Sequence, residues 1–395
     1  MRTRRRRRGY AADDDTSRRT ADDDVVLEIA ARSDAPTLIR CAATCRGMRG
    51  RVVGDPAFLR GRLRLRHATG RFVPPLLRGH LLQIDQYCDD EDEGIHLVAG
   101  AAARPLTAAE GFPPPSGRHK LVSSRDGLLL VRTTAAAAAP PHRLQVLLRV
   151  CDPATGRSHT LPPEPEIPFG RPFMLLKARL VAVSEHRRYL QLQTFSPVRG
   201  AWASHADLRT PRIHGNRIGR LLLTPLVAGG AVHWLYLTSS AGYILKLHAG
   251  EDRVSVSVTA LPETFPRSDD QYQNWWTRYL LATTTAAAGG SPAVLVADTE
   301  KISVWAQSEQ KPGSWKPQVV ILKTTIVPYG PPAAIQLLSF GERSGVMLVR
   351  IYGRHYLLDL SSMARVREFK VSWCPTLHCP YEDLPSWVPT FSKTL

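Results

Sequence analysis

The chain has 395 residues, of which 43% are hydrophobic, so it is long enough for two folded units with a sizeable core. Its formal net charge is +17, and residues 1–19 contribute +5 of it, from eight Arg and three Asp, while the remaining +12 is spread over the rest. The excess is carried mainly by arginine in an alanine-rich chain, a composition that GC-rich coding also produces. It therefore argues against a dedicated nucleic-acid interface.

Cysteine usage and hydropathy narrow the choice of cellular compartment for the protein. The six cysteines, at positions 41, 45, 88, 151, 374 and 379, do not have the spacing of a disulfide framework. No secretory hydrophobic stretch follows the first residues, and no apolar run is long enough to cross a bilayer. We therefore expect a protein of the cytoplasm, the nucleus or both, without a membrane span.

Residues 1–21 alternate basic and acidic blocks and contain few apolar side chains, which is typical of a disordered tail. The arginine run Arg4–Arg8 is open to a second interpretation, as a nuclear address or a phosphate-binding arm.

Residues 22–68 have the pattern of three short helices. Apolar residues recur at helical spacing from Val26 to Ala30, directly after acidic residues that favour a helix N-terminus. Asp34 can cap a second helix, and Asp55 opens a third. Because so small a unit buries little apolar surface, it predicts docking on a partner or on a larger domain.

This helical unit resembles the F-box, and the matching residues are Asp23 to Ile29, Leu38 to Arg40, Cys45 and Asp55 to Phe58. It departs from the family pattern where Met48 replaces Trp and where Ala21-Asp22 and Ser33-Asp34 replace two Leu-Pro pairs. The resemblance implies that a Skp-family adaptor binds here, more weakly than to a full-pattern F-box. The residues implied in adaptor binding are Val25, Val26, Leu27, Ile29, Leu38, Ile39, Met48, Pro56 and Phe58.

Residues 69–120 are expected to be a linker, because Gly70, Pro74 and Pro75 interrupt the helical pattern. The linker contains the acidic run Asp89–Glu93. This run lacks the ligand spacing and the glycine of a calcium loop, so it predicts an exposed acidic loop.

From residue 121 to the end, short β-rich segments alternate with Gly, Pro, Asp and Ser, which predicts an all-β domain. Three pairs of segments read as hairpins: 230–238 with 243–249, 293–298 with 302–307, and 345–351 with 355–360. Similar units recur at intervals near those of propeller blades and predict about six blades. The expected fold is α+β multidomain: a three-helix F-box followed by an all-β, kelch-like propeller.

Two segments of the β-rich region carry a family resemblance. Arg149 to Gly156, followed by Leu161-Pro162-Pro163, resembles a hairpin of plant F-box-associated β-domains, and Ala228 to Leu235 resembles their kelch-like strand. The order of the two parts resembles the large F-box families of plants, particularly grasses. It implies a substrate-recognition subunit of an SCF-type ubiquitin ligase, which brings an unknown target protein to a cullin-RING ligase by proximity.

The chemistry of an enzyme is not evident in the sequence. There is no phosphate-binding glycine loop and no Gly-x-Ser-x-Gly elbow, and the thirteen histidines are scattered. Cys374, His378 and Cys379 lie close together but lack the second ligand pair of a structural zinc site. We therefore expect no catalytic residue, cofactor or metal.

Residues 269–279 combine aromatic, amide and arginine side chains, a mixture typical of binding hot spots. The candidate target-binding residues are Tyr272, Asn274, Trp275, Trp276 and Arg278. Either tryptophan could instead fill the gap between two blades. Two other readings of the whole chain stay open: a nucleic-acid-binding protein that uses its arginine-rich tail, and a propeller enzyme whose ligands converge on the central channel.

Overall fold

The computed structural model describes residues from Phe72 to Glu382. Residues 1–71 and 383–395 lie outside this part, and so do the internal stretches 73, 85–93, 101–102, 109–111, 113–117, 137–143, 154–155, 164–172, 177–178, 187–188, 197–198, 203–205, 210–224, 239, 250–253, 268–274, 286–289, 309–313, 331–332 and 372–376. The helical unit expected at 22–68, its nine adaptor-binding residues and the acidic run Asp89–Glu93 therefore fall outside the described residues. The chain divides into two compact units, and the described residues belong to the one that spans Gly70–Asp383.

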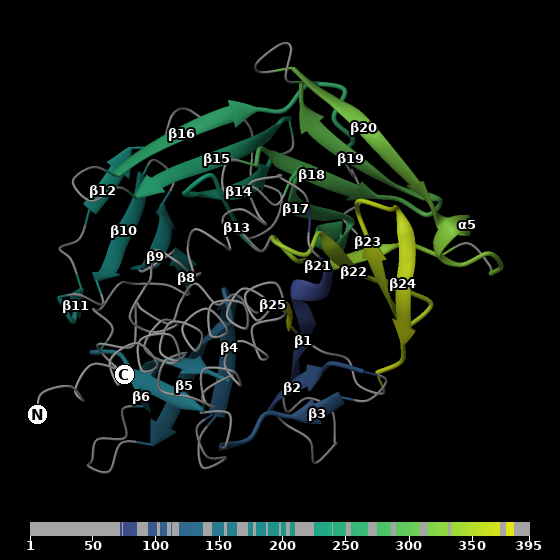
Figure 1. Ribbon diagram of the computed structural model, residues 1–395. Helices are drawn as coiled ribbons and strands as arrows, with labels where there is room; N and C mark the ends of the chain where they lie inside the picture. The colour runs from purple at the N-terminus through teal and green to yellow at the C-terminus, as the bar shows by residue number, and fades with distance from the viewer. Residues whose placement is uncertain are drawn as a thin grey trace, which may run out of the picture. The chain divides into compact units, whose positions relative to one another are not determined.

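The described strands form six antiparallel sheets, which can be followed in Figure 1. Three sheets contain the strands that precede residue 210, together with β25 from the C-terminal end. They are β25 (Leu377–Glu382) with β1 (Leu77–Ile84), β2 (Gly94–Val98) and β3 (Ala103–Pro105); β4 (Arg118–Arg125), β5 (Leu128–Ala136), β6 (Leu144–Asp152) and β7 (Arg157–Thr160); and β8 (Phe173–Leu176), β9 (Arg179–His186), β10 (Tyr189–Ser196), β11 (Ala201–Trp202) and β12 (Ala206–Arg209).

The other three sheets are regular four-stranded meanders. They are β13 (Leu226–Ala228), β14 (Ala231–Leu237), β15 (Gly242–Ala249) and β16 (Val254–Ala260); β17 (Tyr279–Thr283), β18 (Pro292–Ala297), β19 (Lys301–Gln307) and β20 (Trp315–Leu322); and β21 (Gln336–Phe340), β22 (Val346–Ile351), β23 (Arg354–Asp359) and β24 (Ala364–Phe369).

The sheets form a ring, because one edge strand of each sheet contacts the corresponding strand of the next. β25 contacts β4, β4 contacts β8, β13 contacts β17, β17 contacts β21, and β21 returns to β25. The remaining link runs between β12 and β16. The first strand of each sheet thus lies on the inside, which is the arrangement of a β-propeller.

The predicted all-β region is therefore confirmed as a propeller. The expected number of about six blades was wrong, because only five sheets are regular four-stranded blades. The remaining sheet departs from that pattern, since β11 and β12 both pair with β10. Among the described residues, helix is limited to α5 (Lys323–Ile326), the 3-10 turns η1 (Pro74–Leu76) and η3 (Trp275–Arg278), and a single 3-10 residue at Ala108. None of the helices in this part of the chain is long and apolar enough to span a membrane.

The ring is closed by strands from the two ends of the described chain. β1 pairs antiparallel with β25, so that Leu81 lies opposite Cys379. β2 and β3 complete the same sheet, which we call the closing sheet. The expectation of a linker over residues 69–120 and of a β-domain that begins at 121 was therefore wrong. These three strands have their partner near the C-terminus, and a local sequence pattern does not reveal pairing across that distance.

The core lies in the layers between neighbouring sheets. One cluster of buried side chains joins β17–β20 to β21–β24 and includes Leu295 and Val349, and another joins the closing sheet to β4–β7 through Leu81 and Leu129. Inner strands such as β17 are buried at every position, whereas β24 is exposed at five of its six. Strands covered on both faces require continuous apolar runs, which explains why they stand out in the sequence.

The expected hairpins are confirmed, and the turn from β6 to β7 has the predicted chemistry. β14 pairs with β15, β18 with β19 and β22 with β23. Gly156, at the end of the turn from β6 to β7, has φ of +71°, and its N–H donates to the carbonyl oxygen of Asp152 over 2.9 Å. Positive φ is accessible to glycine at low cost, so this motif is read correctly from sequence.

Candidate functional site at the ends of the inner strands

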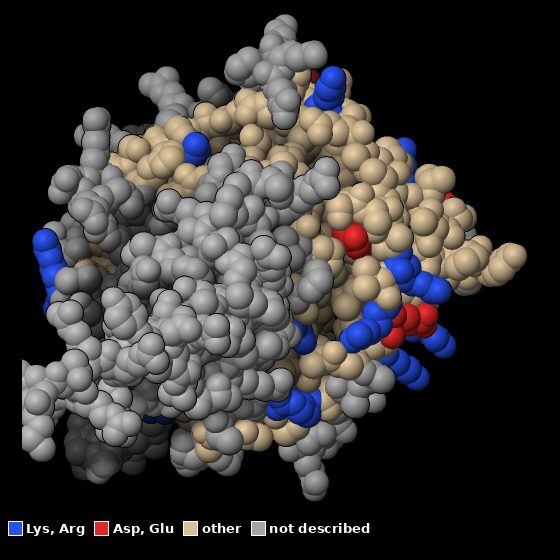
Figure 2. Space-filling model, in the orientation of Figure 1, with Lys and Arg blue, Asp and Glu red and all other residues tan. Residues whose placement is uncertain are grey.

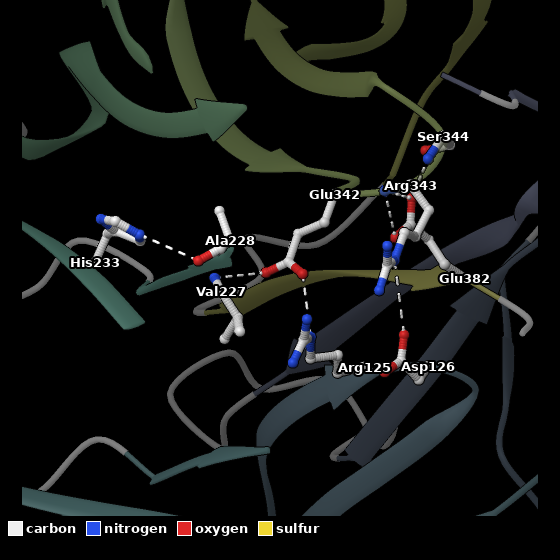
Figure 3. A network of polar contacts seen from close by, with 9 residues as sticks. All are labelled: Arg125, Asp126, Val227, Ala228, His233, Glu342, Arg343, Ser344 and Glu382. Carbon is white, nitrogen blue, oxygen red and sulfur yellow. Dashed lines mark hydrogen bonds and ion pairs between the residues drawn. The ribbon is translucent and has the colours of Figure 1, made fainter. Parts of the chain in front are cut away.

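Charged side chains meet where several inner strands end. Arg125 is the last residue of β4, Glu382 is the last residue of β25, and Glu342 lies in the turn from β21 to β22. Because the first strands of a propeller run in the same direction, these ends lie together. Figure 3 shows the resulting network, in which Glu342 stands between Arg125 and Val227 of β13.

Glu342 links three sheets that are not neighbours in the ring. Its Oε2 accepts a hydrogen bond from Arg125 Nε over 3.1 Å, and its Oε1 accepts from the backbone N–H of Val227 over 2.9 Å. The closing sheet separates the sheets of β21 and β4, and the sheet of β17–β20 separates those of β21 and β13. The contacts therefore bridge across the ring.

Glu382 holds the turn from β21 to β22 against the closing sheet. Its carboxylate oxygens accept from the N–H of Arg343 at 3.1 and 3.2 Å, and Oε1 accepts from the N–H of Ser344 at 2.7 Å. A Cβ at Gly341 would collide with both Glu382 and the Ser344 hydroxyl, so this close approach requires glycine. Arg343 Nε also lies 3.9 Å from Asp126 Oδ1.

The electrostatics of the network indicate a structural role. Burial raises the pKa of Glu382, and hydrogen bonds from Ser344 offset part of that effect. Burial by itself lowers the pKa of Arg125, but Glu342 and Asp126 more than compensate and raise it above the ordinary value. Both oxygens of Glu342 and of Glu382 accept hydrogen bonds, so these carboxylates hold sheets together.

A second polar cluster consists of three buried histidines where the closing sheet meets β21–β24: His80 of β1, His355 of β23 and His378 of β25. The rings of His355 and His378 are 5.7 Å apart, and His355 also stacks on Phe369 at 5.3 Å. His80 Nδ1 lies 3.4 Å from the Ser339 hydroxyl. Among the described residues, His80 Nε2, His378 Nδ1 and both ring nitrogens of His355 have no hydrogen-bond partner.

These histidines are neutral. Burial lowers the pKa of His80 and of His378 to about 3 and that of His355 to about 4, and His355 adds to the effect on the other two. Arg350 lowers the pKa of His355 and His378 further. No three His, Cys, Asp or Glu side chains in the described part are placed to bind a metal ion, so the cluster is a set of buried neutral rings.

The candidate target-binding segment is only partly described. Tyr272 and Asn274 lie outside the described residues, and Trp275 and Trp276 are described as backbone of η3 alone. Arg278 Nε donates to the carbonyl oxygen of Ala297 over 3.3 Å, so this arginine supports the end of β18. Target binding by this segment stays a prediction.

No local sequence pattern indicates the network of Glu342 and Glu382. Its members come from positions 125, 227, 342 and 382, and only ring closure brings them together. Of the proposed cysteine-histidine group, Cys374 lies outside the described residues, and Cys379 is buried with a pKa raised by burial to about 12.

A closed ring of antiparallel sheets whose buried charges serve ring closure is a β-propeller of the kind that serves as a protein-interaction module. The family model "Domain of unknown function (DUF7595)" matches residues 118–364, more than half of the chain, and the chain belongs to this family. The match begins at β4 and ends on the first residue of β24, so it leaves out the strands of the closing sheet.

Solved structures with a similar fold are distant in sequence. A protein from Lactobacillus plantarum is 11% identical with a TM-score of 0.40, and the alignment covers 74% of this chain and 82% of that one. TolB from Acinetobacter baumannii is 9% identical (TM-score 0.42; 77% and 66% covered), and apo AztD from Citrobacter koseri is 9% identical (TM-score 0.38; 77% and 98% covered). No curated protein matches the chain.

Proposed function

We propose that the chain is the substrate-recognition subunit of an SCF-type ubiquitin ligase of the cytoplasm or nucleus. The segment 22–68 docks a Skp-family adaptor, and through it a cullin-RING ligase, while the propeller holds a target protein. The subunit needs no catalytic residue, because it raises the effective concentration of target lysines near a ubiquitin-charged enzyme.

One observation carries the proposal. The propeller is closed by strands from within the described unit and begins at Leu77, nine residues after the F-box-like segment ends. The described strands that close the ring therefore all lie outside residues 22–68. An F-box-like sequence that precedes a propeller closed by its own strands is consistent with a chain that docks an adaptor through one part and binds a target through the other.

Calorimetry with a purified Skp-family adaptor tests the proposal. Leu27→Asp would place an unpaired charge in a desolvated contact, so we expect a loss of affinity on the order of a hundredfold or more. Met48→Trp, which restores the family residue, should strengthen binding, and Leu27→Met serves as the matched control. Equal binding by wild type and Leu27→Asp, or none by wild type where another F-box protein binds, would refute adaptor docking.

The same purified protein distinguishes adaptor docking from the alternative of a nucleic-acid-binding protein. Binding that depends on Arg4–Arg8 and falls steeply with salt, with no adaptor affinity, would favour it.

A further inference from the structure

The exposed large apolar side chains of the described residues gather on two neighbouring sheets. All six lie between positions 320 and 366: Val320, Leu322, Tyr329, Tyr352, Met363 and Val366. Val320 and Leu322 lie on β20, and Val366 lies on β24, which are the outer strands of adjacent sheets. Tyr329 is 91% exposed, Val366 57% and Leu322 54%. Apolar exposure confined to one region of a surface usually marks an interface.

The helix α5 joins the two strands into one surface, because it contacts both β20 and β24. Lys323 Nζ lies 5.0 Å from the centre of the Tyr352 ring, and Arg365 Nη1 donates to the carbonyl oxygen of Ile326 over 3.3 Å. Gly330, next to Tyr329, also lies against the Tyr352 ring, since a Cβ there would be 2.7 Å from it.

We call this surface the outer patch and define it as Val320, Leu322, Tyr329, Tyr352, Arg354, Arg365 and Val366. Met363 is left out because it lies in the turn before β24. Arg354 is included because it pairs with Glu368, near the end of that strand.

Positive charge surrounds the apolar side chains. Arg354 and Arg365 share Glu368, at 2.6 and 3.4 Å, and Arg354 remains 58% exposed. Lys316, Arg367 and Lys370 are further exposed cations on or beside the two outer strands, against the exposed carboxylates of Glu368 and Glu300. In Figure 2, several Lys and Arg side chains gather around one acidic group over the region of β24. The outer patch thus favours a partner of negative charge.

The outer strands are protected against addition of a further strand. In β20, Gln318 is an extra residue beside Pro317, and in β24, Val366 is an extra residue between Arg365 and Arg367. Bulges, proline and charged side chains all discourage main-chain pairing at a sheet edge. A partner is therefore recognised by its side chains rather than as an added strand.

We propose that the outer patch binds an acidic protein segment that carries large apolar or aromatic side chains. Tyrosine and arginine are the residue types that dominate binding hot spots, and Tyr329 and Arg354 are available for contact here. A nucleic acid fits less well, because Val320, Leu322 and Val366 offer nothing to phosphate and Glu368 repels it.

This proposal adds a binding surface to the proposed function, in which the propeller holds a target protein. It rests on the proposed function only in one respect, namely that the acidic segment belongs to a protein that is ubiquitinated. Its test needs neither adaptor nor cullin. The two proposals can therefore fail separately.

The experiment measures fluorescence anisotropy of a labelled peptide, Glu-Glu-Leu-Glu-Tyr-Glu-Glu-Phe, titrated with the full-length protein. Tyr329→Ala should weaken binding about tenfold or more, and Arg354→Glu should weaken it similarly at low salt. Arg157→Glu, at an exposed position of β7 on another sheet, is the matched control and should leave binding unchanged.

Four results would overturn the proposal. The first is no binding by the wild-type protein, and the second is an equal loss with Arg157→Glu. The third is equal affinity for an all-glutamate peptide or for oligothymidylate, which would indicate a general polyanion site. The fourth is a dimer in sedimentation equilibrium that Tyr329→Ala dissociates, which would assign the surface to a second copy of the chain.

Discussion

Glu342 carries the contacts that bridge the propeller ring. It bonds the guanidinium of Arg125 and the N–H of Val227, and both donors come from sheets that do not adjoin its own. This charge pair is partly buried, so removing one partner costs more than an exposed salt bridge is worth, because the other charge has been partly taken out of water.

We predict that Glu342→Ala lowers the free energy of unfolding by about 2–4 kcal/mol. Glu342→Gln keeps an acceptor for Val227 and should cost less. Urea denaturation of both variants measures the difference, with exposed Glu263→Ala as the control, which should cost under about 0.5 kcal/mol. If Glu342→Ala is as stable as the control, the network does not contribute to stability.

The three buried histidines make stability depend on pH. In the unfolded chain each takes up a proton below about pH 6.5, whereas in the folded protein their pKa values are about 3 to 4. The unfolded state therefore binds more protons between these limits. Stability is lost as the pH falls from 6.5 toward 4, by up to about 1.4 kcal/mol per pH unit for each histidine.

His355→Phe provides the test. Neither ring nitrogen of His355 has a described partner, and its ring stacks on Phe369, so phenylalanine keeps the packing and removes one titrating group. We expect near-native or higher stability at pH 7 and a shallower loss between pH 6.5 and 4. Half-buried His159 of β7, changed to Gln, is the control. An unchanged slope in His355→Phe would show that His355 titrates normally.

At the scale of elements, sequence predicts what is local. The hairpin of β14 and β15 was expected because its strands adjoin in sequence, and the turn at Gly156 was expected from its Asp-Pro opening. β1 was missed because its partner β25 lies almost three hundred residues away. The Glu342 network was missed for the same reason, since it exists only once the ring is closed.

Two truncations test the closure by β25. A chain that ends at Thr376 lacks the inner strand of the closing sheet and its buried Tyr381 and Glu382, so β1 loses one pairing edge. We expect loss of the cooperative thermal transition or insoluble protein, whereas a chain that ends at Asp383 keeps every described strand and should unfold like the wild type. Equal melting temperatures would show that the ring does not need β25.

At the scale of the whole molecule, the arginine-rich N-terminal residues precede the described propeller in the sequence. Residues 1–19 hold eight of the arginines, and the described propeller begins well after them. We predict that a chain lacking residues 1–19 has unchanged solubility, unfolding and adaptor affinity, and weaker salt-sensitive binding to heparin. Loss of soluble protein would show that the tail takes part in folding.

The most direct test of the proposed function is reconstitution of the full-length chain with a Skp-family adaptor and a cullin, followed by size-exclusion chromatography with light scattering. We predict one complex that contains one copy of each protein. We also predict that Leu27→Asp abolishes this complex although the variant keeps the circular dichroism spectrum of the wild type. Separate elution of the wild-type chain, under conditions where another F-box protein enters the complex, would contradict it and leave a propeller interaction module outside the ubiquitin ligases.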